Sequence, residues 1–204
     1  GELDAALERY QAAVALDPRC APAHVGIAVI SRKRGNLPAA YDGLRHATEL
    51  YPQDRNAWMT LASVCLDMQK PEEAGHAYDK VLEIYPDDVR AHRGKGFALT
   101  TAWRLADAMK CFAAALDIDP DDVDSLVQDA LCRYRMGDFK KAIERAEDAI
   151  ELDEKQVGAR VVLGRAHWHL KQLKESERAI AEAHALAPES LEIMCYLAQT
   201  RLDR

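Results

Sequence analysis

The chain has 204 residues, of which 49% are hydrophobic and 30% charged, so it is long and apolar enough to bury a core. Its formal net charge of −7 argues against non-specific binding to nucleic acid or to an anionic membrane, because both need a basic surface. No apolar run approaches the roughly 20 residues of a membrane-spanning helix, so no membrane insertion is expected.

The residue types favour helices and give no sign of a cofactor. Aromatic residues make up only 6% of the chain, and alanine, the best helix former, occurs throughout. The five cysteines form no C-x-x-C pair, so we expect free thiols and no zinc site, disulfide framework or other cofactor. The first residues, "GELDAALERY", carry no targeting signal, and we expect a cytoplasmic chain unless such a signal lies outside it.

The predicted elements follow a 34-residue spacing that continues along the whole chain. Prolines recur in one phase of this spacing, alanines in a second, and mostly large apolar residues in a third. The three series are Pro18, Pro52, Pro86, Pro120 and Pro188; Ala6, Ala40, Ala74, Ala108 and Ala142; and Tyr10, Leu44, Tyr78, Phe112, Ala146 and Ile180.

In chain order, residues 1–20 are predicted to hold one helix, 3–16, and its exit turn. Each following copy is predicted to hold two antiparallel amphipathic helices, A and then B, and residues 191–204 hold one more helix A. The complete copies are 21–54, 55–88, 89–122, 123–156 and 157–190. Because the two end segments together make up one further copy, we interpret the chain as a window from a longer array.

The residues that form the turns follow the same 34-residue spacing. Gly35 and Gly137 stand where a helix A ends and a left-handed residue is favoured. Proline after each helix B cannot continue the helix, and the residue before the next helix A is a good N-cap. The expected N-caps are Asp54, Asp88, Asp122 and Ser190.

This pattern resembles the tetratricopeptide repeat family, whose 34-residue unit carries W-x2-L-G-x2-Y, then A-x3-F, then proline. The resemblance covers the whole chain. It implies an all-α, right-handed superhelical solenoid of antiparallel helix pairs, with residues 1–204 forming a single array. The copy at 55–88 carries it most completely, with Trp58, Leu61, Ala62, Cys65, Ala74, Tyr78 and Pro86.

The resemblance also implies where a partner binds, because helix A residues of this family line a concave groove. The corresponding side chains here are apolar or basic, which suits a protein or peptide ligand that is amphipathic or acidic. The candidate partner-binding residues are Val25, Val29, Arg32, Asn56, Met59, Ser63, Arg90, Arg93, Phe97, Leu131, Tyr134, Arg165 and Trp168.

One ligand class of the family is not expected. Members that hold the acidic C-terminus of heat-shock chaperones use a clamp of lysines, asparagines and an arginine on successive A helices. Of the residues at the matching positions only Arg93 is basic; the others are Val25, Val29, Met59, Ser63 and Phe97.

The chain is predicted to be a non-catalytic scaffold for protein–protein interaction, since none of the common catalytic or phosphate-binding motifs occurs in it. Two alternatives remain open. One is a substrate-recognition segment of a larger enzyme such as a glycosyltransferase. The other is a scaffold that assembles with itself, head to tail, through apolar faces on helices 3–16 and 191–204.

Three charged residues occupy positions that are normally apolar. Lys95 and Asp129 stand at the leucine position of consecutive copies, and Arg133 follows Asp129 by one helical turn. An unpaired charge on that face is costly. We therefore predict that Asp129 pairs with Arg133 along its own helix and with Lys95 across the copy boundary; the alternative is that the charges reach solvent.

Overall fold

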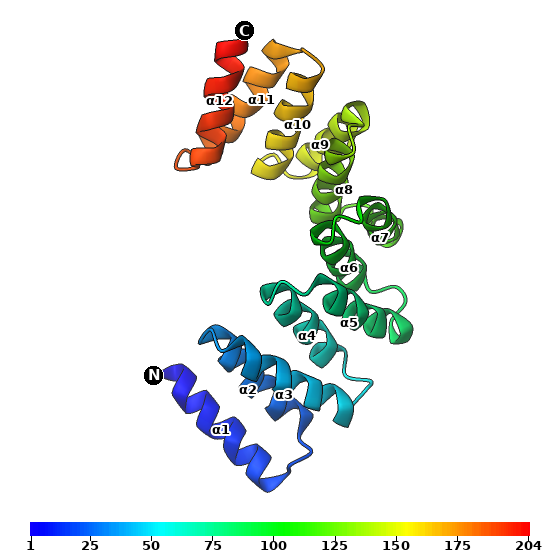
Figure 1. Ribbon diagram of the computed structural model, residues 1–204, viewed down its shortest axis with the longest axis vertical. Coiled ribbons are helices and arrows are strands. Elements are labelled where there is room, and N and C mark those ends of the chain that lie inside the picture. The colour runs from blue at the N-terminus through cyan, green and yellow to red at the C-terminus, as the bar shows by residue number, and fades with distance from the viewer. The chain divides into compact units, whose positions relative to one another are not determined.

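The computed structural model describes all residues from 1 to 204, and they form twelve helices and no strand (Figure 1). The chain divides into two compact units, Gly1–Ala102 and Trp103–Arg204, here called unit 1 and unit 2. Unit 1 contains α1 (Glu2–Leu16), α2 (Ala21–Lys33), α3 (Leu37–Leu50), α4 (Arg55–Asp67), α5 (Pro71–Ile84) and α6 (Val89–Thr101). Unit 2 contains α7 (Leu105–Ile118), α8 (Val123–Arg135), α9 (Phe139–Leu152), α10 (Val157–His169), α11 (Leu173–Leu186) and α12 (Leu191–Asp203).

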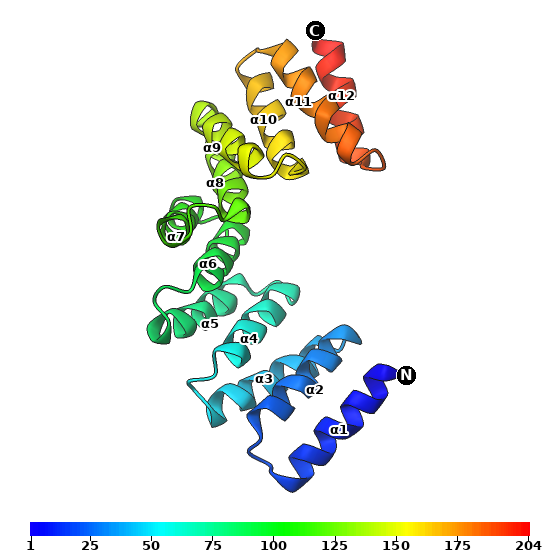
Figure 2. The ribbon, with the colours of Figure 1, turned by 180° about the vertical axis from the view of Figure 1, so that it is seen from behind.

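Even-numbered helices are the predicted A helices and odd-numbered ones the B helices. Within each unit, each helix packs against its neighbours in sequence, as Figure 1 shows for α2 to α4 and Figure 2 shows from behind for α10 to α12. Within each unit A helices also contact the next A helix, whereas no two B helices contact each other. The A helices therefore form the closely spaced row of each unit, and the B helices lie on its outer side.

The turn between helices A and B has one conformation in every copy. Its left-handed residue is a glycine in two copies, with φ of 77° at Gly35 and 83° at Gly137. The residues 34 positions along, Gln69, Trp103 and Lys171, adopt the same region with φ of 58–61°. A side chain in this region costs about 1 kcal/mol, so the packing of the two helices overrides the local preference of three residues.

Side chains at the start of several A helices attach them to the preceding turn. Asp54 accepts hydrogen bonds from the backbone N–H groups of Asn56 and Ala57, and Asp88 accepts one from Ala91. Ser190 makes the same kind of bond. Asp122 is the N-cap of α8 but makes no such bond.

The tryptophan position of the repeat fixes the proline turn. Trp58 Nε1 donates to the carbonyl oxygen of Pro52 at 2.9 Å. Nε2 of His24 and His92 lies 2.9 and 2.8 Å from the carbonyl oxygens of Pro18 and Pro86, the equivalent prolines. Histidine thus replaces tryptophan here because its ring also places an N–H at that carbonyl.

Large and small residues complement each other between consecutive copies. A Cβ atom added to Gly94 of α6 would lie 2.4 Å from the ring of Tyr78 in α5, and one added to Gly26 of α2 would lie 2.5 Å from the ring of Tyr10 in α1. Tyr78 is only 5% exposed and belongs to the core of unit 1. The alanines at one position of four copies are fully buried, so the helices approach closely; they are Ala40, Ala74, Ala108 and Ala142.

This complementarity predicts opposite effects for two glycine-to-alanine changes in neighbouring helices. Gly94→Ala overpacks against Tyr78 and is expected to lower the free energy of unfolding by about 1–3 kcal/mol. Gly75→Ala in α5 meets no atom within 4 Å and is expected to raise it by up to about 1 kcal/mol, because alanine is the better helix former. Urea denaturation of both variants measures the difference. Equal effects would contradict this account of the packing.

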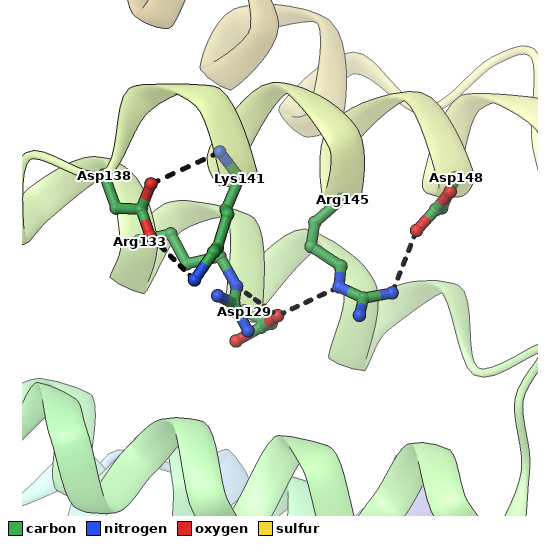
Figure 3. A network of polar contacts seen from close by, with 6 residues as sticks. All are labelled: Asp129, Arg133, Asp138, Lys141, Arg145 and Asp148. Atoms are coloured by element: carbon green, nitrogen blue, oxygen red, sulfur yellow. Dashed lines mark hydrogen bonds and ion pairs between the residues drawn. The ribbon is translucent and has the colours of Figure 1, made fainter.

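The charged positions form an ion-pair network between α8 and α9 (Figure 3). Asp129 is 4% exposed, and its Oδ2 atom accepts a hydrogen bond of 2.7 Å from Arg133 Nε. Arg145 Nε of α9 lies 3.5 Å from the same oxygen and joins Asp148 at its other end. The predicted Asp129–Arg133 pair is therefore confirmed, and the solvent-exposed alternative is wrong for Asp129.

The other half of that prediction involves Lys95. Within unit 1, Lys95 Nζ lies 2.6 Å from Asp79 Oδ1. A pair between Lys95 and Asp129 would join the two units and stays a prediction.

The buried carboxylate supplies a stability test. Asp129→Ala is expected to lower the free energy of unfolding by about 2–3 kcal/mol, because it leaves the half-buried Arg133 without its partner. Asp148→Ala removes a more exposed partner of Arg145 and is expected to cost no more than about 0.5 kcal/mol. Denaturant melts of the two variants compare the pairs directly. A loss below about 0.5 kcal/mol for Asp129→Ala would refute the role of the buried pair.

Candidate functional site

The predicted site residues lie on the A helices of both units. In unit 1 they belong to α2, α4 and α6, and in unit 2 to α8 and α10. Most are half-buried, whereas Asn56, Arg90 and Phe97 are exposed. The close row of A helices in each unit therefore presents these residues as a mixed apolar and basic surface.

In unit 1 the predicted residues divide between packing and exposure. Val25 and Met59 pack against the core, and Ser63 Oγ donates to its own helix backbone at Met59. Arg32 Nε lies 2.5 Å from Asp67 Oδ2, so this guanidinium already has a carboxylate partner. Phe97 is 46% exposed and is the large apolar side chain of this row that remains accessible to solvent.

In unit 2, helices α8, α10, α11 and α12 form a cavity of about 210 Å³. Three predicted residues, Tyr134, Arg165 and Trp168, line it together. The other lining residues are Gly164, His169, Ser176, Ile180, Tyr196, Gln199 and Thr200, from α10, α11 and α12. Leu131, the remaining predicted residue of this unit, packs against its core instead.

Arg165 is held between two aromatic rings in this cavity. Its guanidinium carbon lies 4.7 Å from the ring centroid of Tyr134 in α8 and 4.7 Å from that of Tyr196 in α12. Such cation–π contacts hold the charge close to both rings. Three A helices thus position one cation.

Most other polar groups of the cavity wall are bonded within the protein. The Tyr196 hydroxyl donates to Glu192 at 2.6 Å. Trp168 Nε1 and Gln199 Nε2 each donate to Asp203 at 2.8 Å. The interior of the cavity is therefore mostly apolar, with Arg165 as its cation.

His169 connects the cavity to the start of α9. Its ring stacks on Phe139 at 4.5 Å, and its Nε2 shares a hydrogen bond of 3.0 Å with the Tyr134 hydroxyl. Burial, together with the positive charges of Arg165 and Lys171, holds the pKa of His169 below its ordinary value.

Several residues of this cavity were not among the predicted contacts. Tyr196, Gln199 and Thr200 belong to α12, a helix considered only for its apolar outer face, and His169 is the last residue of α10. The sequence did contain a signal for the α12 residues. Gln199 and Thr200 follow Tyr196 by three and four residues, so the three side chains share one helix face.

A second hollow, of about 470 Å³, lies between α3, α4 and α5 of unit 1. Two of its polar side chains bond to each other, since the Tyr41 hydroxyl donates to Glu73 at 2.6 Å, and Nζ of the nearby Lys70 lies 2.9 Å from the same carboxylate. At its base, burial raises the pKa of the Cys65 thiol to about 11, which keeps the thiol protonated and unreactive at neutral pH.

No group of three or more histidine, cysteine or acidic side chains is arranged to hold a metal ion. None of the helices combines the length and the apolar character that crossing a bilayer requires.

These features define a class of protein: an all-helical repeat protein built from antiparallel helix pairs. Family models support a closer assignment. Two models described as tetratricopeptide repeat match residues 1–64 and 59–123, and a model described as anaphase-promoting complex, cyclosome, subunit 3 matches residues 103–183. The chain belongs to the tetratricopeptide repeat family.

Similar proteins of known sequence share only part of their length with this chain. DnaJ homolog subfamily C member 3 of Bos taurus is 39% identical over 90 residues, which are 44% of this chain and 18% of that protein. Protein CTR9 homolog of Arabidopsis thaliana is 25% identical over 119 residues, 58% of this chain and 11% of that protein. The chain thus spans less than a fifth of these curated relatives.

Solved structures share the fold at low sequence identity. PilW, described as a widely conserved type IV pilus biogenesis factor, has a TM-score of 0.79 at 17% identity, covering 90% of this chain and 86% of its own. YrrB, described as a tetratricopeptide repeat protein with an unusual peptide-binding site, has a TM-score of 0.74 at 17% identity, covering 96% and 100%. At this identity the likeness shows the fold alone.

The surroundings of His169 predict its titration. Because its folded pKa is depressed, His169 adds nothing to the pH dependence well above pH 6.5, and it destabilises the fold as pH falls from about 6.5 towards the folded pKa. Arg165→Gln removes one of the neighbouring charges and is expected to raise the pKa of His169. NMR titration of the histidine side chains in both proteins measures it; an unchanged pKa would contradict the coupling.

Proposed function

We propose that this chain is a non-catalytic scaffold that binds a peptide or helix of a partner protein on its A-helix surface, in the cytoplasm. The observation that carries the proposal is the unit 2 cavity, where two A helices, α8 and α10, bring Tyr134, Arg165 and Trp168 together. Aromatic and arginine side chains dominate the energetics of protein interfaces. The exposed Phe97 on the A-helix row of unit 1 supports the same use of that surface.

The experiment compares capture of partners by the wild-type chain and by variants of each A-helix row. Arg93→Ala with Phe97→Ala alters unit 1, and Tyr134→Ala with Trp168→Ala alters unit 2. We expect at least one double variant to lose the partner that the wild type captures, with at least a tenfold weaker affinity for the purified partner, because two interface side chains are removed.

The matched control is Lys110→Ala on the B helix α7, whose side chain is 78% exposed. It is expected to capture the same partner as the wild type, and melting curves check that all variants fold. If both double variants retained full affinity, the partner would not bind on the A-helix rows and the proposal would fail.

Self-assembly is the second candidate, and a specific observation favours it. No residue of α1 is buried, and Leu16 is 89% exposed. On α12, Leu191 and Leu202 are 75% and 81% exposed. We propose as the alternative that these apolar faces stack head to tail between copies.

Self-assembly predicts a molecular mass that rises with concentration. Leu191→Glu together with Leu202→Glu is expected to return the chain to a monomer, because it places charges on the apolar face of α12. Light scattering over a dilution series makes the measurement. A wild-type chain that stays monomeric at millimolar concentration would exclude this alternative.

The role as a segment of a larger enzyme, such as a glycosyltransferase, stays open as a further proposal.

A further inference from the structure

The unit 2 cavity contains one cation that has no carboxylate partner. No ion pair joins Arg165 to an acidic side chain, whereas Arg104, Arg133 and Arg178 in the same unit each have one. The guanidinium carbon of Arg165 lies over two tyrosine rings, 4.7 Å from each ring centroid. Neither ring is a carboxylate acceptor for its N–H groups, and carboxylate is the acceptor that matches a guanidinium in geometry and charge.

The rest of the cavity is suited to an apolar group. Its volume of about 210 Å³ exceeds the roughly 150 Å³ that is known to accept benzene in a protein interior. Gly164 and Ile180 line it, and the polar tips of Trp168 and Tyr196 are bonded to Asp203 and Glu192. A leucine-sized side chain therefore fits this cavity by size and by polarity.

We propose that the unit 2 cavity binds an apolar side chain of the partner peptide while Arg165 binds a carboxylate directly beside that side chain. This inference rests on the proposed function and names the chemistry that its unit 2 site recognises. The carboxylate is either the C-terminus of the peptide or an aspartate or glutamate next to the apolar residue.

Four short acetylated peptides test the proposal by isothermal titration calorimetry with the full chain. Two end in leucine, one with a free C-terminal carboxylate and one with an amide. The other two carry leucine followed by an internal aspartate or, as its neutral match, asparagine, and both end in an amide. We expect at least one carboxylate peptide to bind about tenfold more tightly than its neutral match. The pair that shows the difference identifies the source of the carboxylate.

Variants assign the effect to the guanidinium. Arg165→Gln is expected to bind the carboxylate peptide no more tightly than the wild type binds the neutral one. Arg165→Lys keeps the charge without the planar fork and is expected to lie between them. Arg178→Gln on α11, whose side chain is 83% exposed and pairs with Glu182, is the matched control and is expected to bind like the wild type. Thermal melts confirm that each variant is folded.

A peptide in which glycine replaces leucine is expected to bind about tenfold more weakly, because it leaves the cavity empty. Equal affinity for carboxylate and neutral peptides, equal affinity of the wild type and Arg165→Gln, or no binding of any peptide at about 1 mM would each overturn this inference. Capture of a protein partner by the A-helix rows would stand in those cases, so the two proposals fail separately.

Discussion

The close approach of helices A and B is the constraint on which the rest of the structure depends. Fully buried alanines recur at one position of four copies, with the buried Ser176 in the fifth. A large residue of one copy also fits against a small residue of the next, as Tyr78 does against Gly94. Two helices can approach this closely only if one contributes almost no side chain at the contact. The register of one pair therefore sets the register of its neighbour, and a short amphipathic hairpin becomes a repeating unit.

Polar side chains complete this packing at the ends of the helices. The ring N–H groups of Trp58, His24 and His92 each donate to the carbonyl oxygen of the equivalent proline. Tryptophan and histidine therefore make the same hydrogen bond at this position of the repeat. The turn after helix A shows the same dominance of packing over local preference. Gln69, Trp103 and Lys171 take the left-handed conformation that Gly35 and Gly137 adopt without cost.

Two charged residues of unit 2, Asp129 and Arg165, differ in their consequences. At the leucine position of α8, Asp129 is buried and bonded to Arg133, which makes it part of the fold. On α10, Arg165 contacts two aromatic rings and no carboxylate, which leaves its N–H groups for a ligand. The first charge belongs to the fold and the second is the one we propose for recognition, and the difference lies in what surrounds each charge.

The sequence by itself determined the helices, their order and the family, because a 34-residue spacing of alanine, proline and aromatic residues depends only on contacts within a copy and with its neighbours. It also identified Tyr134, Arg165 and Trp168 as surface residues of helix A, since helical periodicity decides which face a residue occupies. Only the tertiary structure decided that Tyr196 of α12 completes the stack on Arg165, and that Arg32 is already paired with Asp67. Both contacts join side chains more than 30 residues apart, and their formation depends on rotamers and on the distance between A helices, which no repeat pattern encodes.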